Sequence, residues 1–177
     1  MRDPKIHGGL PLSGKILNVH PSKISMKDAI ENVALKNIIS SVGLIPGQRV
    51  NRHNLKYGKV YITTDADEDG KNIAALLVNF FFQWWPELFD DANKPFLYVF
   101  ETPLIVARKG KEVKYWYNDD YHNFDPDKFK GWDIVRAKGL AALKKADWKI
   151  LLDKPRLIPI VNDGKLQESL DLLFNDD

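Results

Sequence analysis

Apolar residues along this chain recur with two spacings, about two residues and about 3.6 residues, which predict strands and helices respectively. Short β-branched and aromatic runs predict strands at 60–64, 96–100 and 157–161. Between the first two strands, apolar residues at helical spacing predict an amphipathic helix over 73–84, which ends before Pro86. These are the strongest patterns in the chain.

Weaker patterns predict the remaining elements. Residues 1–22, rich in glycine and proline, are expected to form an extended, unpacked arm. A helix is expected to begin at Ser25 and stop at Gly43, with an apolar face made of Ile30, Val33, Ala34 and Ile38. The other expected elements are a hairpin of 104–107 and 112–117, a strand at 134–135 and helices at 140–152 and 166–174. This order predicts an α/β domain with a largely parallel sheet.

Composition narrows the class of protein. At 177 residues the chain is expected to form one domain with short extensions. The sequence has no cysteine, which excludes a disulfide scaffold, a cysteine-ligated metal site and a thiol nucleophile. The near-apolar run 73–85 is too short to span a bilayer, and residues 1–15 do not resemble a signal peptide. We therefore expect a soluble globular protein of the cytosolic type, without membrane association.

The acidic run Asp65, Asp67 and Asp69 is the feature that carries chemistry. Three carboxylates so close together repel one another unless a cation or basic group offsets them. The run follows a predicted strand, and open α/β sheets bind ligands at the carboxyl ends of their strands. Because alternate residues of an extended segment point the same way, the three could converge on one point. Hard oxygen ligands of this kind suit Mg²⁺.

Other interpretations of the run are open to different degrees. An EF-hand loop is rejected, because it would need a glutamate where Leu76 stands. A haloacid-dehalogenase-like phosphatase would need Thr or Val in place of Asp69. A Mg²⁺-dependent phosphatase or nuclease that uses Asp65 as nucleophile or ligand is a further alternative. The run could also be a plain acidic surface turn, with Asp69 capping the next helix.

Four segments, in order, resemble motifs of the type IIA DNA topoisomerases. Residues 10–19 resemble the family's "LPLxGKxLNV" segment, and residues 61–70 resemble its "MTDADxDG" motif. Residues 101–104 resemble its "TPL" segment, and residues 137–140 resemble its "YKGLG" segment. The ordered set covers nearly the whole chain. It resembles the Toprim-containing, C-terminal part of the ATPase-bearing large subunit.

The resemblance implies a Toprim fold: a Rossmann-like, mostly parallel sheet flanked by helices. It implies an N-terminal arm and linking helix over 1–55, a metal-binding core with a hairpin insertion over 56–152, and a C-terminal extension of strand and helix over 153–177. It also implies that Asp65 and Asp67 are the catalytic Mg²⁺ ligands, with Asp69 as a weaker third ligand. The further implied site residues are Gly70 for the turn into the helix and, for DNA contact, Lys15, Ile16, Leu17, Asn18 and Lys138.

The resemblance also implies partners. The family's "EGDSA" motif, which supplies a catalytic glutamate, has no counterpart in the chain, and neither do its ATPase motifs or its nucleophilic tyrosine. We therefore expect DNA, an ATPase and transducer piece that carries the glutamate, and a tyrosine-bearing winged-helix subunit as partners. The chain would be one piece of a split large subunit, as in large tailed phages, or a shortened form of a longer protein. It would act in a bacterial or phage-infected host cytoplasm. The alternative is a non-catalytic, Toprim-like regulatory module that binds DNA or a topoisomerase.

Overall fold

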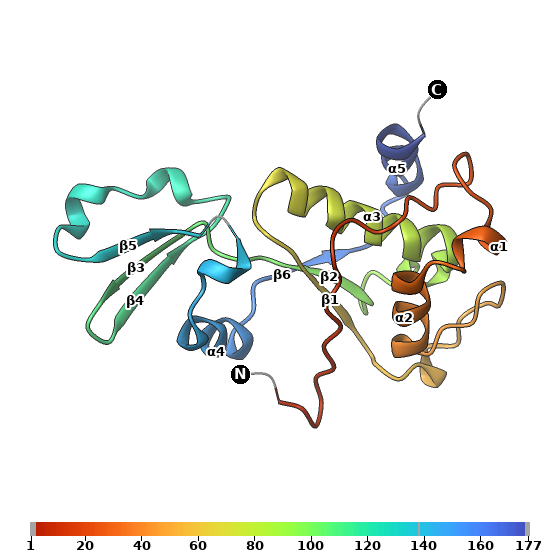
Figure 1. Ribbon diagram of the computed structural model, residues 1–177, viewed down its shortest axis with the longest axis horizontal. Coiled ribbons are helices and arrows are strands. Elements are labelled where there is room, and N and C mark those ends of the chain that lie inside the picture. Colours follow the sequence, from red (N-terminus) through yellow and green to blue (C-terminus); the bar gives the residue numbers. More distant parts are fainter. Residues whose placement is uncertain (1–2, 138, 176–177) are drawn as a thin grey trace.

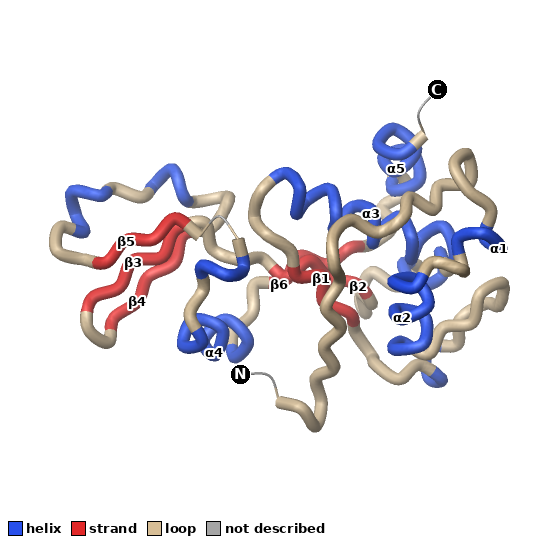
Figure 2. Tube along the Cα trace, in the orientation of Figure 1, coloured by secondary structure: helices blue, strands red, loops and turns tan. Residues whose placement is uncertain are grey.

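The computed structural model describes residues 3–137 and 139–175, and it contains two three-stranded sheets (Figures 1 and 2). The first sheet has the order β1-β2-β6, from β1 (Val60–Thr63), β2 (Leu97–Phe100) and β6 (Leu157–Ile160). β1 and β2 are parallel because the long helix α3 carries the chain back between them. β6 is antiparallel to β2, since Leu157 pairs with Phe100 and the chain thus re-enters the sheet where β2 leaves it.

The second sheet has the order β4-β3-β5 and is entirely antiparallel. It contains β3 (Ile105–Lys109), β4 (Glu112–Trp116) and β5 (Asp133–Arg136). The turn between β3 and β4 holds Gly110 at φ +59°, a conformation that favours glycine. The α/β class is confirmed, and so are the expected strands and hairpin. The first sheet is mixed and the second is antiparallel, so the expectation of a largely parallel sheet is wrong: β6 returns antiparallel to β2, and the tight turn after β3 enforces antiparallel pairing.

Helix α3 (Glu68–Trp84) is the expected long helix, and its aromatic residues form the middle of the larger core. Phe80, Phe81 and the C-cap residue Trp85 are almost fully buried, and Phe80 contacts the rings of the other two. Within residues 3–137 and 139–175, no helix is long and apolar enough to cross a membrane.

Residues 25–43 form two helices where one was expected, α1 (Met26–Ala29) and α2 (Val33–Val42). Ser25 caps α1 as predicted, but Asn32 accepts hydrogen bonds from the first N–H groups of α2 and starts a new helix. The new start rotates the buried face, so Val33 is 70% exposed while Leu35 and Ile39 are buried. Gly43 ends α2 at φ +85°, as expected.

The segment expected as one helix over 140–152 is also broken. A 3₁₀ turn (Leu140–Ala142) comes first, and α4 (Lys145–Asp153) begins after it. Asp147 causes this new start, because its Oδ2 accepts the backbone N–H of Lys144 at 2.7 Å and fixes the first turn of α4. The last helix, α5 (Leu166–Phe174), has the expected bounds.

The N-terminal arm has no helix or strand over residues 3–22, as expected, but it is packed against the fold. Ile16 and Val19 are buried in the larger core. His20 Nε2 lies 2.8 Å from Asp171 Oδ1, which ties the arm to α5. Hydrogen bonds from His20, and next from Gln167, lower the pKa of the Asp171 carboxyl. The expectation of an unpacked arm is therefore wrong, since apolar side chains of the arm complete the core.

The buried side chains form two clusters: the larger joins the arm, α2, α3 and the first sheet, and the smaller joins α4, the second sheet and one end of the first. The ladder between β2 and β6 belongs to both clusters. Leu97 and its partner Ile160 pack in the larger cluster, whereas Phe100 and its partner Leu157 pack in the smaller one with Val106. The boundaries expected near residues 55 and 152 stay a prediction.

Candidate metal centre

The acidic run lies between the carboxyl end of β1 and the first turn of α3. Asp65, Asp67 and Asp69 are all exposed. Because β2 runs parallel to β1, the residues that follow Phe100 leave the sheet at the same edge. The sequence prediction of carboxylates at a strand's carboxyl end is thus confirmed in position.

Asp65 is closely approached by two glycines, Gly70 and Gly139. Its Oδ1 accepts the backbone N–H of Leu140 at 2.7 Å, across 75 residues of chain. A Cβ added to Gly70 would lie 1.9 Å from the backbone oxygen of Asp65, and a Cβ added to Gly139 would lie 3.1 Å from Asp65 Oδ2. Gly70 is therefore required by the close approach to Asp65 rather than by an unusual φ, and its role in the turn into the helix stays a prediction.

Asp67 is the N-cap of α3, and Asp69 lies inside the first turn. Asp67 Oδ1 accepts the backbone N–H of Gly70 at 2.8 Å. Asp69 Oδ1 lies 3.0 Å from Nζ of Lys15 on the arm. The interpretation of Asp69 as the helix cap is therefore wrong, because Asp67 stands at the position whose side chain reaches the free N–H groups.

The three carboxylates do not converge as a set. Each has its own partner, and across the described part of the chain no group of three or more His, Asp or Glu side chains could hold a metal ion. The expectation of convergence assumed an extended segment. Because α3 begins at Glu68, helical geometry replaces extended geometry within the run and turns Asp69 away from the other two positions.

Asp65 and Asp67 nevertheless fit a hard cation. Each carboxylate uses Oδ1 for one backbone N–H, and the described residues donate no hydrogen bond to either Oδ2. Lys15 pairs with Asp69, and Lys71 pairs with the neighbouring Glu68 at 2.6 Å, so each of these two acids has a lysine partner. Among residues 3–137 and 139–175, only backbone N–H groups contact the Asp65 and Asp67 carboxylates. One or two carboxylates with open sites around them are the usual protein contribution to Mg²⁺ binding.

The residues expected to contact DNA have different environments. Lys15 is half-exposed beside the acidic run, and Leu17 is partly buried. Ile16 is 6% exposed, and Asn18 is hydrogen-bonded to Asn79 and to the Phe174 carbonyl. Lys138 lies outside the described residues. DNA contact by these residues stays a prediction, and the structure gives Ile16 and Asn18 packing roles.

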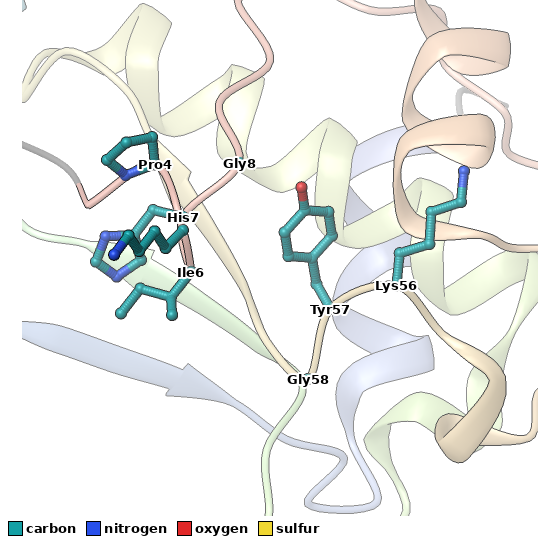
Figure 3. A pocket seen from close by; sticks show the side chains of 8 residues that line it. Pro4, Ile6, His7, Gly8, Lys56, Tyr57 and Gly58 are labelled. Carbon is teal, nitrogen blue, oxygen red and sulfur yellow. The ribbon is translucent and has the colours of Figure 1, made fainter.

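The surface has two notable hollows, and only one of them lies beside the acidic run. One, of about 490 Å³, borders the acidic run and is lined on one side by α3 and on the other by the second sheet, with Glu68, Lys71, Tyr121 and Arg136 among its residues. The other, of about 450 Å³, lies between the start of the arm and the loop before β1, away from the run (Figure 3). There the side chain of Tyr57 points toward Gly8. A Cβ added to Gly8 would lie 2.4 Å from the tyrosine hydroxyl oxygen.

Sequence reasoning missed a buried polar network between α4 and the second sheet. Asp147, 2% exposed, pairs with Arg108 and accepts the Tyr115 hydroxyl at 3.1 Å. Burial, and next the charge of Asp147, raise the pKa of Tyr115. The network fastens α4 to the second sheet, and no sequence pattern distinguishes Asp147 from an exposed helix acid.

The fold and the acidic run together define the class of protein. Residues 2–101, more than half of the chain, match the Toprim domain family, so the chain belongs to the Toprim family. Its structure is similar to that of the Plasmodium falciparum topoisomerase II DNA-binding, cleavage and re-ligation domain, with a TM-score of 0.76 and 28% identity. That likeness covers 94% of this chain and 23% of the other.

Curated relatives place the chain more narrowly, as a homologue of the Toprim regions of gyrase B and type II topoisomerases. It is 35% identical over 161 residues to the chloroplastic/mitochondrial DNA gyrase B of Oryza sativa subsp. japonica, covering 88% of this chain and 21% of that protein. It is 31% identical over 173 residues to the DNA gyrase B of Archaeoglobus fulgidus, covering 96% of this chain and 27% of that protein. The chain thus spans about a quarter of these relatives' lengths.

Proposed function

We propose that the chain is a component of an ATP-dependent type II DNA topoisomerase, in which Asp65 and Asp67 hold Mg²⁺ at the scissile phosphate. One observation carries the proposal: two exposed carboxylates stand at the carboxyl end of β1 in a Toprim domain, and no side-chain cation of residues 3–137 or 139–175 pairs with either. The similarity to a topoisomerase II cleavage domain and to gyrase B supports the choice of reaction.

Each residue of the run has its own task in this proposal. Asp65 and Asp67 would hold the cation through the carboxylate oxygens that accept no hydrogen bond from the described residues. When bound, the metal ion polarises the phosphate and stabilises the charge that develops on the leaving 3′-oxygen of DNA. Asp69 holds Lys15, which places a half-exposed ammonium group beside the path of a phosphate backbone. Asp69 would be a weaker or water-mediated ligand.

The proposal requires other proteins or segments. The general acid–base glutamate, the ATPase and transducer, and the nucleophilic tyrosine on a winged-helix subunit are assigned to partner chains or to segments outside this sequence. We extend the proposal to a large subunit that is assembled from separate pieces in the cytoplasm of a bacterium or a phage-infected host. DNA and these subunits are the proposed partners.

The test is relaxation of supercoiled DNA by the enzyme reconstituted from this chain and its partner chains. Asp65→Ala and Asp67→Ala should each abolish relaxation while co-purification with the partners is retained. Glu168→Gln, an exposed acid on α5, is the matched control and should relax DNA at the wild-type rate. Full activity in both aspartate variants would contradict the metal assignment.

A second measurement separates this function from the regulatory alternative and from a phosphatase or nuclease. The purified chain with DNA and Mg²⁺ should not cleave DNA or release phosphate, because the tyrosine is supplied by a partner. Cleavage or phosphatase turnover by the chain alone would refute the proposal. Stimulation of a complete topoisomerase by the Asp65→Ala variant as well as by the wild type would favour the regulatory module.

A further inference from the structure

The segment that follows β5, the last strand of the second sheet, contacts the acidic run. Leu140 donates its backbone N–H to Asp65 Oδ1 at 2.7 Å, and this is the longest-range contact of the run among the described residues. Leu140 is the first residue of the 3₁₀ turn, where a backbone N–H has no partner within the turn itself. The contact therefore satisfies a free N–H group and a carboxylate together.

Gly139 makes this contact possible. Its backbone is extended, at φ −158° and ψ 167°, a conformation that any residue adopts. A side chain is instead opposed by space, since a Cβ would lie 3.1 Å from Oδ2 and 3.2 Å from Cγ of Asp65. A methyl group there would displace the carboxylate by a few tenths of an ångström without straining the backbone.

The Gly139–Leu140 segment is supported by buried residues on both sides. Before it, Ala137 is buried in the smaller core and donates its N–H to the Leu104 carbonyl at 2.7 Å. After it, Leu143 is buried in the same core, and Asp147 fixes α4 to the second sheet. The position of Asp65 is therefore set by the second sheet as well as by β1.

We propose that Gly139 and the Leu140 N–H are positioning groups for Asp65: they select one orientation of its carboxylate for the divalent cation. The inference rests on the proposed metal role of Asp65. Groups that hydrogen-bond a metal-ligating carboxylate fix its orientation, and their loss typically weakens metal binding about tenfold or more. The second sheet would thereby control the metal site through a single backbone N–H.

The test uses the full chain and Mn²⁺, a hard cation whose binding is read from paramagnetic broadening of NMR signals. Leu140→Pro removes the N–H, and proline suits the first position of a helical turn after an extended residue. Leu140→Ala, which keeps the N–H, is its control. Gly139→Ala adds the methyl group, and its control is Gly58→Ala, where a Cβ would meet nothing within 4 Å. We expect about tenfold weaker Mn²⁺ binding for Leu140→Pro and Gly139→Ala, and wild-type affinity for both controls.

A readout without metal tests the hydrogen bond itself. The Leu140 amide should exchange with solvent more slowly in the wild type than in Asp65→Asn or Asp65→Ala, with thermal stability recorded for every variant. Wild-type affinity in Leu140→Pro and Gly139→Ala, while Asp65→Asn loses binding, would overturn the positioning role alone. Wild-type affinity in Asp65→Asn, or no binding by the wild type, would overturn the metal role and this inference with it.

Discussion

Asp67 combines two roles, and substitutions can separate them. Its Oδ1 accepts the N–H of Gly70 at 2.8 Å at the start of a 17-residue helix, and the side chain is exposed, so its removal leaves no cavity. Loss of such a cap costs about 1 kcal/mol. For a chain of this size, that corresponds to a fall of about 2–4 °C in Tm. Asp67→Ala loses cap and ligand together, whereas Asp67→Asn keeps a good cap and loses the charged ligand.

The assay is urea unfolding followed by circular dichroism, with Mn²⁺ titration of the same samples. Asp67→Ala should be destabilised by about 1 kcal/mol, and Asp67→Asn should unfold within a few tenths of a kcal/mol of the wild type. Both should bind Mn²⁺ weakly. Glu168→Gln, an exposed acid on α5 far from the run in sequence, is the control and should keep the wild-type stability and Mn²⁺ affinity. Equal stability of the Ala and Asn variants at position 67 would refute the capping argument, and wild-type Mn²⁺ affinity in the Asn variant would refute the ligand role.

Three further predictions concern the frame around the site. Gly70→Ala should lower the free energy of unfolding by about 1–3 kcal/mol in urea titrations, since its Cβ would lie 1.9 Å from a backbone oxygen; wild-type stability would contradict the close approach. Asp147→Ala should cost about 3–5 kcal/mol, because it leaves Arg108 buried without its carboxylate partner; a loss below about 1 kcal/mol would show that solvent reaches the pair. The pKa of Asp171 is lowered by the hydrogen bond from His20, so its contribution to stability is complete above about pH 3.9 and is lost as the pH falls toward the folded-state pKa. Asp171→Asn should therefore reduce the loss of unfolding free energy as the pH falls through the acid range. An unchanged loss in this variant would show that the contact between His20 and Asp171 does not cause it.

Local patterns predicted the elements well where one force dominates. The apolar spacing of α3 and the β-branched run of β1 were sufficient, because burial of one face decides both structures. Predictions failed where a polar side chain competes with the pattern. Asn32 and Asp147 each restart a helix by accepting backbone N–H groups, and neither residue interrupts the apolar spacing.

The site was predictable in its position but not in its geometry. The acidic run and its strand end were visible in the sequence, and the resemblance singled out residues 137–140. The contact between Leu140 and Asp65 joins positions 75 residues apart through a backbone N–H, which no side-chain pattern records. The ion pair of Lys15 with Asp69 depends on how the arm packs, and that packing follows from apolar contacts of Ile16.

The ladder between β2 and β6 has a consequence for how the molecule unfolds. The short path along β2 from Leu97 to Phe100 leads from the larger hydrophobic cluster into the smaller one, and the paired strand makes the same passage from Ile160 to Leu157. Neither cluster can therefore lose β2 or β6 while the other keeps them. Heat or denaturant should therefore melt both clusters in one cooperative transition, and the loop that bears Asp65 shares the stability of the whole chain.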